Sequence, residues 1–378
     1  MLGIEFPIFA FSHCRDVVAA VSKAGGFGVL GVARLTPDQL ETELNWIEKE
    51  IGDRPYGVDA QIPAKVYGDT AVELTREELE ARIPKQHREY MNGLMAKYGV
   101  PELPAELSGD VGMHYADSRD AFSRAKELQL LEVALRHRIK LIATALGPPP
   151  GHLVDDAHKR GVRVAGLVGA KKHALRQMDA GVDLIIAQSY EAGGHTGEIG
   201  GMVLIPEVVD AVAPVPVLAA GGIATGRQFA AALALGAQGV WTGSVWLTTE
   251  EAETHPVVKE KLLRATSSDT VRTRSETGKP VRQLRSAWND EWDGPNSPGP
   301  LPSPLQWLLY VEAYERIERA ANTSKGAREL MTYPVGQVVG ALTQIKPVRQ
   351  VVFDMVDEYL TVAQAFADEM AGTEETSR

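Results

Sequence analysis

Residues 162–197 read VRVAGLVGAKKHALRQMDAGVDLIIAQSYEAGGHTG, and this stretch decides the fold class. Two apolar runs, VRVAGL at 162–167 and DLIIAQ at 183–188, flank an amphipathic segment that ends in glycine. Continuous apolar runs are typical of strands buried on both faces, and glycine commonly follows a helix C-terminus. The stretch therefore predicts a strand–helix–strand unit, followed by a polar, glycine-rich turn.

The same alternation extends over the first two thirds of the chain. Amphipathic segments that are predicted helices lie between most of the apolar runs. Eight runs are predicted strands: 6–10, 27–31, 56–61, 139–144, 162–167, 183–188, 215–219 and 238–242. Eight strands separated by helices favour a closed parallel (β/α)8 barrel, or TIM barrel, and an open doubly wound sheet is the alternative.

Two segments depart from this alternation. Residues from about 64 to 137 form a long helical insertion after the third strand, which we interpret as a cap over the barrel mouth. The Pro- and Gly-rich segment 274–304 predicts a structured loop or linker rather than a helix, whereas 305–320 and 346–371 are predicted helices. The expected domains are a barrel over 1–255, including the insertion, and a loop plus α-rich C-terminal subdomain over 256–378.

The composition narrows the classes of partner. The 378 residues are 44% hydrophobic and 24% charged, with a net charge of −11, which disfavours the basic face that nucleic-acid binding requires. No apolar run approaches the ~20 residues that span a bilayer, and no secretory signal is evident, so we expect a cytoplasmic protein. Cys14 is the only cysteine, which excludes an intramolecular disulfide, and a small buried apolar role is favoured over a nucleophilic one.

The most informative motif is QSYEAGGHTG at 188–197, directly after the sixth predicted strand. Residues that follow a strand of a parallel barrel face the active-site mouth. Gly193 and Gly194 permit a close approach of the backbone to a ligand, and His195 carries a side chain that titrates near neutral pH. His195 is therefore the candidate acid–base residue, and a flexible surface loop is the alternative.

Two further glycine-containing turns follow the seventh and eighth predicted strands. They are Gly221 and Gly222 in LAAGGIATG, and Gly243 with Ser244 in VWTGSV. The loops after strands seven and eight of a barrel commonly form a phosphate site, in which backbone amides bind the anion. Together the two turns predict a phosphorylated ligand at the mouth.

Other motifs receive structural interpretations. Gly26, Gly28 and Gly31 satisfy G-x-G-x-x-G, but they follow a predicted helix and lie within a strand, so helix capping and tight packing explain them better than a dinucleotide site. Several histidines show no metal-ligand spacing, namely His13, His114, His152, His158 and His173. Arginines and tryptophans of the 274–304 segment are interpreted as tethers and anchors, with recognition of an anion or flavin as the alternative: Arg274, Arg282, Arg285, Trp288 and Trp292.

EAGGHTG at 191–197, AAGGI at 219–223 and TGS at 242–244 resemble the nitronate monooxygenase family, also called 2-nitropropane dioxygenases. The related flavin-dependent enoyl-acyl-carrier-protein reductases share the EAGGH element. The resemblance covers about 1–255, and YPVGQ at 333–337 extends it into the helical region.

The resemblance implies FMN at the barrel mouth. Trp241 and Ser244 depart from a family stretch that usually reads Gln-x-Gly-Thr, and Phe9–Ser12 stands where a Pro-Met-like segment is common. The cofactor-binding residues that the resemblance implies are Gln61, Gln188, Gly193, Gly194, Gly221, Gly222, Trp241, Thr242, Gly243 and Ser244.

The resemblance also implies an activity. We expect oxidation of alkyl nitronates or nitroalkanes by FMN and O2 to a carbonyl compound and nitrite, with His195 as the catalytic base. The alternative enzyme is an NAD(P)H-dependent flavin reductase of an enoyl or CoA thioester, and a third possibility is a non-catalytic binder of flavin or phosphate. The expected partners are a small-molecule substrate and O2, with no metal, nucleic acid or membrane, and a homo-oligomer is left open.

Overall fold

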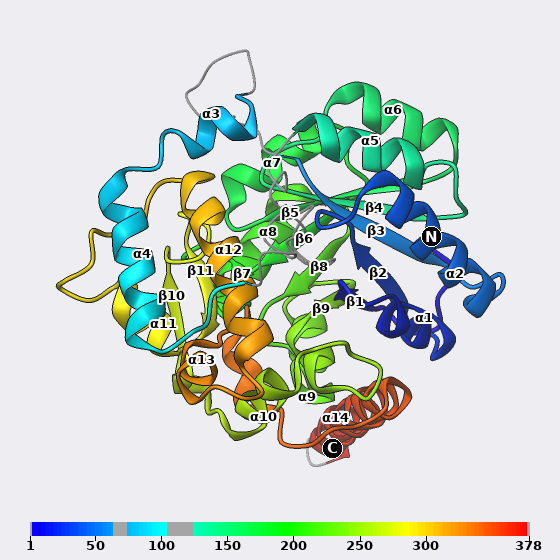
Figure 1. Ribbon diagram of the computed structural model, residues 1–378. Helices are drawn as coiled ribbons and strands as arrows, with labels where there is room; N and C mark the ends of the chain where they lie inside the picture. Colours follow the sequence, from blue (N-terminus) through cyan, green and yellow to red (C-terminus); the bar gives the residue numbers. More distant parts are fainter. Residues whose placement is uncertain (1, 63–73, 104–123, 376–378) are drawn as a thin grey trace.

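The computed structural model describes residues 2–62, 74–103 and 124–375. Eight parallel strands form a closed barrel in the order β1-β2-β3-β4-β5-β6-β8-β9 (Figure 1). Their bounds are β1 Ile8–Ser12, β2 Phe27–Gly31, β3 Tyr56–Gln61, β4 Leu141–Ala145, β5 Arg163–Val168, β6 Leu184–Gln188, β8 Val217–Ala220 and β9 Gly239–Thr242. The predicted TIM barrel is confirmed, and each predicted strand lies within two residues of the observed one.

Helices cover the outside of the barrel because the strands are apolar on both faces. They are α1 Arg15–Lys23, α2 Pro37–Ile51, α5 Arg124–Ala134, α6 Gly151–Lys159, α7 Lys171–Asp179, α8 Gly201–Val212 and α9 Gly226–Ala234. One apolar cluster, which includes Phe9, Phe27, Leu141 and Ile186, fills the barrel interior. A second, which includes Leu30, Val58 and Ile185, lies between the strands and the helices. The barrel is therefore a packed core, and ligands can reach only its rim.

Helix α5 packs as a helix of the barrel, although the sequence placed it in the inserted segment. It contacts α2 and β3 on the outside of the barrel. The other described helices of this excursion, α3 Arg76–Glu80 and α4 Lys85–Lys97, contact α12 (Leu305–Ala320). Tyr98, directly after α4, donates a hydrogen bond to Glu291 at 2.8 Å. The described part of the excursion thus lies against the C-terminal subdomain, and the rest of the expected cap falls outside the described residues.

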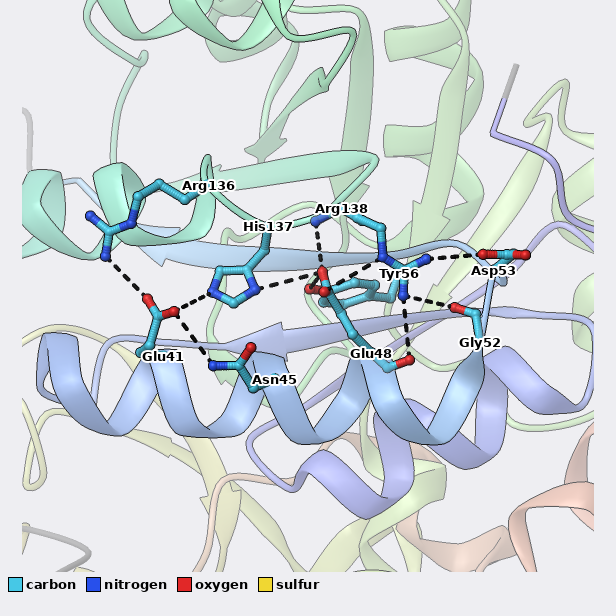
Figure 2. A network of polar contacts seen from close by, with 9 residues as sticks. All are labelled: Glu41, Asn45, Glu48, Gly52, Asp53, Tyr56, Arg136, His137 and Arg138. Carbon is cyan, nitrogen blue, oxygen red and sulfur yellow. Dashed lines mark hydrogen bonds and ion pairs between the residues drawn. The ribbon is translucent and has the colours of Figure 1, made fainter.

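A polar network holds the start of β3 and the turn before β4 against α2 (Figure 2). The Glu48 carboxylate accepts hydrogen bonds from the Tyr56 hydroxyl at 2.9 Å and from the backbone amide of Arg138 at 2.6 Å. The ring of His137 lies between Glu41 and Glu48, with N–O distances of 3.4 and 3.6 Å. These residues are at the N-terminal ends of the strands, where a barrel's residues contribute to stability rather than to catalysis.

Downstream of the barrel, the chain forms a small antiparallel sheet beside it (Figure 1). Strands β10 Thr270–Thr273 and β11 Val281–Leu284 pair with each other, and β11 also pairs with β7, the dipeptide Gly194–His195. Helix α11, Ala287–Trp292, follows. The prediction that 274–304 contains no helix is therefore wrong.

Local interactions explain why helix α11 forms within this segment. Ser286 and Asn289 form a reciprocal cap at the start of α11, in which the Ser286 amide donates to Asn289 Oδ1 at 2.9 Å. Trp288 and Trp292 are fully buried, so their interpretation as anchors is confirmed. The Pro and Gly residues that dominate the segment's composition come mainly after this short helix, over 294–304.

The remaining helices enclose a third apolar cluster that runs from the outer face of β1 into the C-terminal subdomain. They are α10 Pro256–Arg264, α12, α13 Lys325–Leu330 and α14 Val348–Glu375. Both helices predicted here are confirmed as α12 and α14, and α14 packs against α9 and α1. No helix among the described residues has the length and apolarity needed to cross a membrane.

The glycines of GGFGVLG serve packing between helix and strand. A Cβ on Gly28 would overlap the carbonyl oxygen of Val18 in α1, so β2 approaches this helix more closely than any side chain allows. Gly31 likewise lies directly against the His13 ring. These contacts explain the motif without a dinucleotide.

Replacement of Gly28 by Ala is expected to destabilise the fold by about 2–4 kcal/mol, because either β2 or α1 must shift. Gly93→Ala is the matched control: Gly93 is exposed within α4 and nothing lies within 4 Å of its added Cβ, so this variant should gain up to about 1 kcal/mol. Urea unfolding monitored by tryptophan fluorescence measures both. Equal stability of the two variants would contradict the close packing of β2 on α1.

Candidate active site

The loop Gln188–Gly197 leaves the C-terminal end of β6 and is held in place by the small sheet. Within that sheet, His195 pairs with Val281 of β11. The Arg282 guanidinium lies 4.4 Å from the centre of the Tyr190 ring, and its Nε donates to the Tyr190 carbonyl at 3.1 Å. The loop is therefore a fixed part of the fold, which excludes its interpretation as a flexible surface loop.

A second contact joins this loop to the turn after β9. A Cβ on Gly193 would lie 2.7 Å from the backbone of Val335 and Gly336, so only glycine fits there. The Gly336 amide in turn donates to Ser244 Oγ at 2.9 Å. The YPVGQ segment thus lies between the His195 loop and the Gly243–Ser244 turn. The close approach that Gly193 permits is to the protein's own C-terminal part.

The predicted glycine turns meet at adjacent strand ends. β6, β8 and β9 are neighbours, with Gln188 opposite Ala220 and Ala220 opposite Trp241. Gly221 and Gly222 have φ of +97° and +71°, a left-handed backbone that favours glycine. Four partly exposed backbone amides in the two turns donate no hydrogen bond to any described residue: those of Gly221, Gly222, Gly243 and Ser244.

These turns fit the phosphate of a flavin nucleotide. Convergent free amides are what a bound phosphate requires. Beside them, Ser189 is fully buried and its Oγ has no partner among the described residues. A Cβ on Gly221 would overlap this Oγ, so the hydroxyl lies against the turn itself. The Ser244 hydroxyl accepts a hydrogen bond from the Gly336 amide, which leaves its own hydrogen as well as the Ser244 backbone amide to donate to a ligand.

Trp241 closes the barrel interior just below the mouth. Its ring stacks on Phe9 and Phe11 of β1, with centroid distances of 6.3 and 6.4 Å. Thr242, the next residue, is buried on the opposite side of β9, and its hydroxyl donates to the Phe9 carbonyl at 2.9 Å. Trp241, which departs from the family pattern, therefore forms an apolar surface at the top of the barrel interior. The Thr242 hydroxyl is used in a hydrogen bond between β9 and β1.

At the end of β3, the structure reveals two buried carboxylates that sequence reasoning missed. Val58 and Ala60 pack outward against helices, so Asp59 and Gln61 face the barrel interior. Glu127 of α5 is fully buried, and its Oε2 accepts a hydrogen bond from the Gln61 amide at 3.1 Å. Burial raises the pKa of Glu127 to about 8, and burial together with the Glu127 charge raises the pKa of Asp59 well above its usual value. The sequence contained one indication of these buried carboxylates, namely an aspartate inside the otherwise apolar strand YGVDAQ.

His195 points at a residue from the C-terminal subdomain. Its Nε2 lies 2.9 Å from Thr277 Oγ1, in the turn between β10 and β11. Burial, followed by the positive charge of Lys279, lowers the pKa of His195 to about 4. The imidazole is therefore neutral at physiological pH, which is the state that a base requires.

The turn between β10 and β11 contains a second buried titratable residue, Glu276. Glu276, which precedes Thr277, is 4% exposed, and its Oε2 has no partner among the described residues. Burial raises the pKa of Glu276 to about 7, against the lowering effect of the Arg34 charge. Arg34 follows β2, which lies opposite β6 in the barrel order, whereas Thr277 contacts His195 after β6. Thr277 thus contacts the loop after β6, while the charge of Arg34, from the opposite side of the barrel, acts on Glu276.

Arg282 tethers the 274–304 segment to Tyr190, whereas Arg274 and Arg285 form contacts within the segment. Arg285 pairs with Asp290 at 2.8 Å, and Arg274 donates to the Gly278 carbonyl at 3.2 Å. Cys14 is buried, and its Sγ contacts the Glu251 carbonyl at 3.2 Å, as expected for a residue that packs rather than reacts. Of the histidines considered earlier, His13 bonds the Gly31 carbonyl at 3.0 Å, and His114 lies outside the described residues.

With this geometry in place, residues 2–358 match the profile of the family described as nitronate monooxygenase. The chain belongs to the nitronate monooxygenase family. A Mycobacterium tuberculosis protein named as a monooxygenase is 57% identical over 368 residues, 96% of each chain. Two solved structures are similar throughout. Nitroalkane oxidase from Streptomyces ansochromogenes is 26% identical with a TM-score of 0.76, and the match covers 96% of this chain and 98% of that one. FabK from Thermotoga maritima is 27% identical with a TM-score of 0.69, and the match covers 97% of each chain.

Glu127→Gln is expected to alter how stability depends on pH. Because the folded state raises the pKa of Glu127 to about 8, its contribution to stability is full below the unfolded pKa near 4 and is lost as pH rises toward 8. Between pH 5.5 and 8, the wild type should therefore lose on the order of 2–3 kcal/mol more than the variant, whose amide stays uncharged.

Urea unfolding at the two pH values measures this difference. Glu132→Gln is the control, since Glu132 is exposed on the same helix, and its pH dependence should match that of the wild type. If the free energy of unfolding of all three proteins changed equally with pH, the protonation of Glu127 in the folded state would be contradicted.

Proposed function

We propose that this member of the family binds FMN and oxidises alkyl nitronates, or the parent nitroalkanes, with O2 to a carbonyl compound and nitrite. The observation that carries the proposal is a neutral imidazole, His195, on a loop whose other residues contact the 221–222 turn directly and the 243–244 turn through Gly336, two turns whose backbone amides are unengaged. Membership of the nitronate monooxygenase family supports the flavin and the reaction class.

The chain's own residues would hold the cofactor at the rim of the barrel. Backbone amides of the 221–222 and 243–244 turns suit the phosphate, and the Ser244 hydroxyl can donate to it as well. Gln61 and Gln188, which end β3 and β6, carry amide side chains that would hydrogen-bond the flavin ring. When bound, FMN supplies the electron-accepting chemistry that no protein side chain provides.

His195 acts as the base. Its neutral ring takes the proton from the carbon next to the nitro group, and the negative charge then moves onto the nitro oxygens. Lys279 lies within electrostatic range of the ring, because its charge lowers the pKa of His195, and so it favours the anion that forms there. A preformed nitronate is already an anion. Lys279 would therefore stabilise it in the same way, but His195 has no proton to remove from it.

The purified protein is expected to carry a yellow chromophore, and anaerobic mixing tests what reduces it. Rapid bleaching by a nitronate, followed by reoxidation and nitrite release when O2 is admitted, is the expected result. Bleaching by NADH or NADPH alone would instead favour the reductase, an alternative kept by the likeness to FabK. A chromophore that neither compound bleaches would indicate a non-catalytic binder.

His195→Asn should retain FMN yet lose at least ~100-fold in kcat/KM for a neutral nitroalkane, because general-base catalysis typically contributes 10²–10⁴-fold. His195 should contribute no ionisation near 6.5 to the wild-type kcat/KM profile, since its pKa is lowered to about 4, and an ionisation near 7 would belong to Glu276 and persist in Thr277→Ser.

Visible absorbance of the bound flavin and a nitrite assay from pH 5 to 8 provide the measurements. His173→Asn, which changes an exposed histidine of α7, is the control and should match the wild type. The base role would be disproved by full nitroalkane turnover in His195→Asn.

A further inference from the structure

The partner of His195 comes from the C-terminal subdomain. Thr277 is buried, and its Oγ1 lies 2.9 Å from His195 Nε2. The same Oγ1 also lies 3.3 Å from the backbone nitrogen of Lys279 and 3.3 Å from its carbonyl oxygen. One hydroxyl therefore has three polar neighbours.

The number of protons decides how these contacts are made. A threonine hydroxyl has one hydrogen to donate and two lone pairs. The Lys279 amide can only donate, so it takes one lone pair, and the Lys279 carbonyl can only accept, so it takes the hydrogen. The remaining lone pair faces His195 Nε2, which must then carry a hydrogen. If the hydroxyl instead donated to Nε2, its contact with the Lys279 carbonyl would have no proton.

We propose that Thr277 is a positioning residue that holds the proton of neutral His195 on Nε2 and so makes Nδ1 the atom that accepts the substrate proton. The substrate part of this inference rests on the proposed function. Nδ1 has no hydrogen-bond partner within the described parts of the chain, so its lone pair is available to a ligand. A neutral imidazole can be a base only at the nitrogen without hydrogen, which makes the tautomer a requirement for catalysis.

The backbone fixes this contact before any ligand binds. His195 pairs with Val281 of β11, and Thr277 lies four residues before Val281 in the turn that leads into the same strand. Both partners are therefore positioned by one strand. The subdomain that follows the barrel thus contributes to the protonation state of a residue at the barrel mouth.

The test uses the FMN-loaded protein, labelled with ¹⁵N in its nine histidines, and the tautomer-sensitive ring ¹⁵N signals. His195→Asn identifies the His195 signals by their loss. In the wild type and in Thr277→Ser, which keeps the hydroxyl, Nε2 should be protonated and Nδ1 unprotonated. In Thr277→Val, which replaces the hydroxyl by a methyl group, a substantial Nδ1-protonated population should appear.

Activity supplies a second readout. Thr277→Val should lose about 5–10-fold in kcat for the neutral nitroalkane, the effect of roughly one hydrogen bond, whereas turnover of preformed nitronate should change less than about twofold. Thr277→Ser should restore nitroalkane turnover. Thr277→Ala is a second hydroxyl-free variant if the Val variant folds poorly.

Two results would overturn the inference: an Nδ1-protonated ring in the wild type, or an unchanged tautomer in the hydroxyl-free variants. The NMR measurement needs no substrate. A tautomer shift without nitronate oxidation would therefore leave the role of Thr277 standing and refute the proposed function alone.

Discussion

The pairing of β7 with β11 is the interaction on which the rest of the site depends. A two-residue strand, Gly194–His195, has little stability by itself, and it persists because β10 and β11 supply the other two strands of the sheet. The pairing places His195 opposite Val281 and thereby brings it to Thr277. A histidine on a loop after a barrel strand becomes a residue with one orientation, which is what proton transfer requires.

Burial sets the charges around this residue. The His195 ring is neutral because packing against protein atoms removes water from around it and because Lys279 opposes a second positive charge. Burial also raises the pKa values of Glu276 and of the Asp59–Glu127 pair. Glu276 directly precedes Thr277, so a weakly acidic carboxyl belongs to the same turn as the partner of the uncharged imidazole.

Glycine has two different uses at the mouth. Gly193 has no room for a side chain because the backbone of Val335 and Gly336 lies against it, so it joins the barrel to the C-terminal part. Gly221 and Gly222 are required by their left-handed backbone, and their amides remain available to a ligand. The first use stabilises the loop that carries His195, and the second leaves amides that would suit the phosphate of the proposed cofactor. A glycine of EAGGH, Gly193, is therefore required by packing within the protein.

The sequence by itself determined the barrel, because strands buried on both faces must be apolar throughout and the intervening helices must be amphipathic, a pattern visible in most of the units. It also determined which strand ends carry the glycine turns and His195, since position along a parallel barrel follows from chain order. Only the tertiary structure decided that Thr277 and Glu276 reach the mouth, because they come from a segment some eighty residues later whose Pro and Gly content suggested a linker. Likewise, the proton on Glu127 depends on burial between α5 and β3, and burial arises from packing between distant segments, which local sequence does not encode.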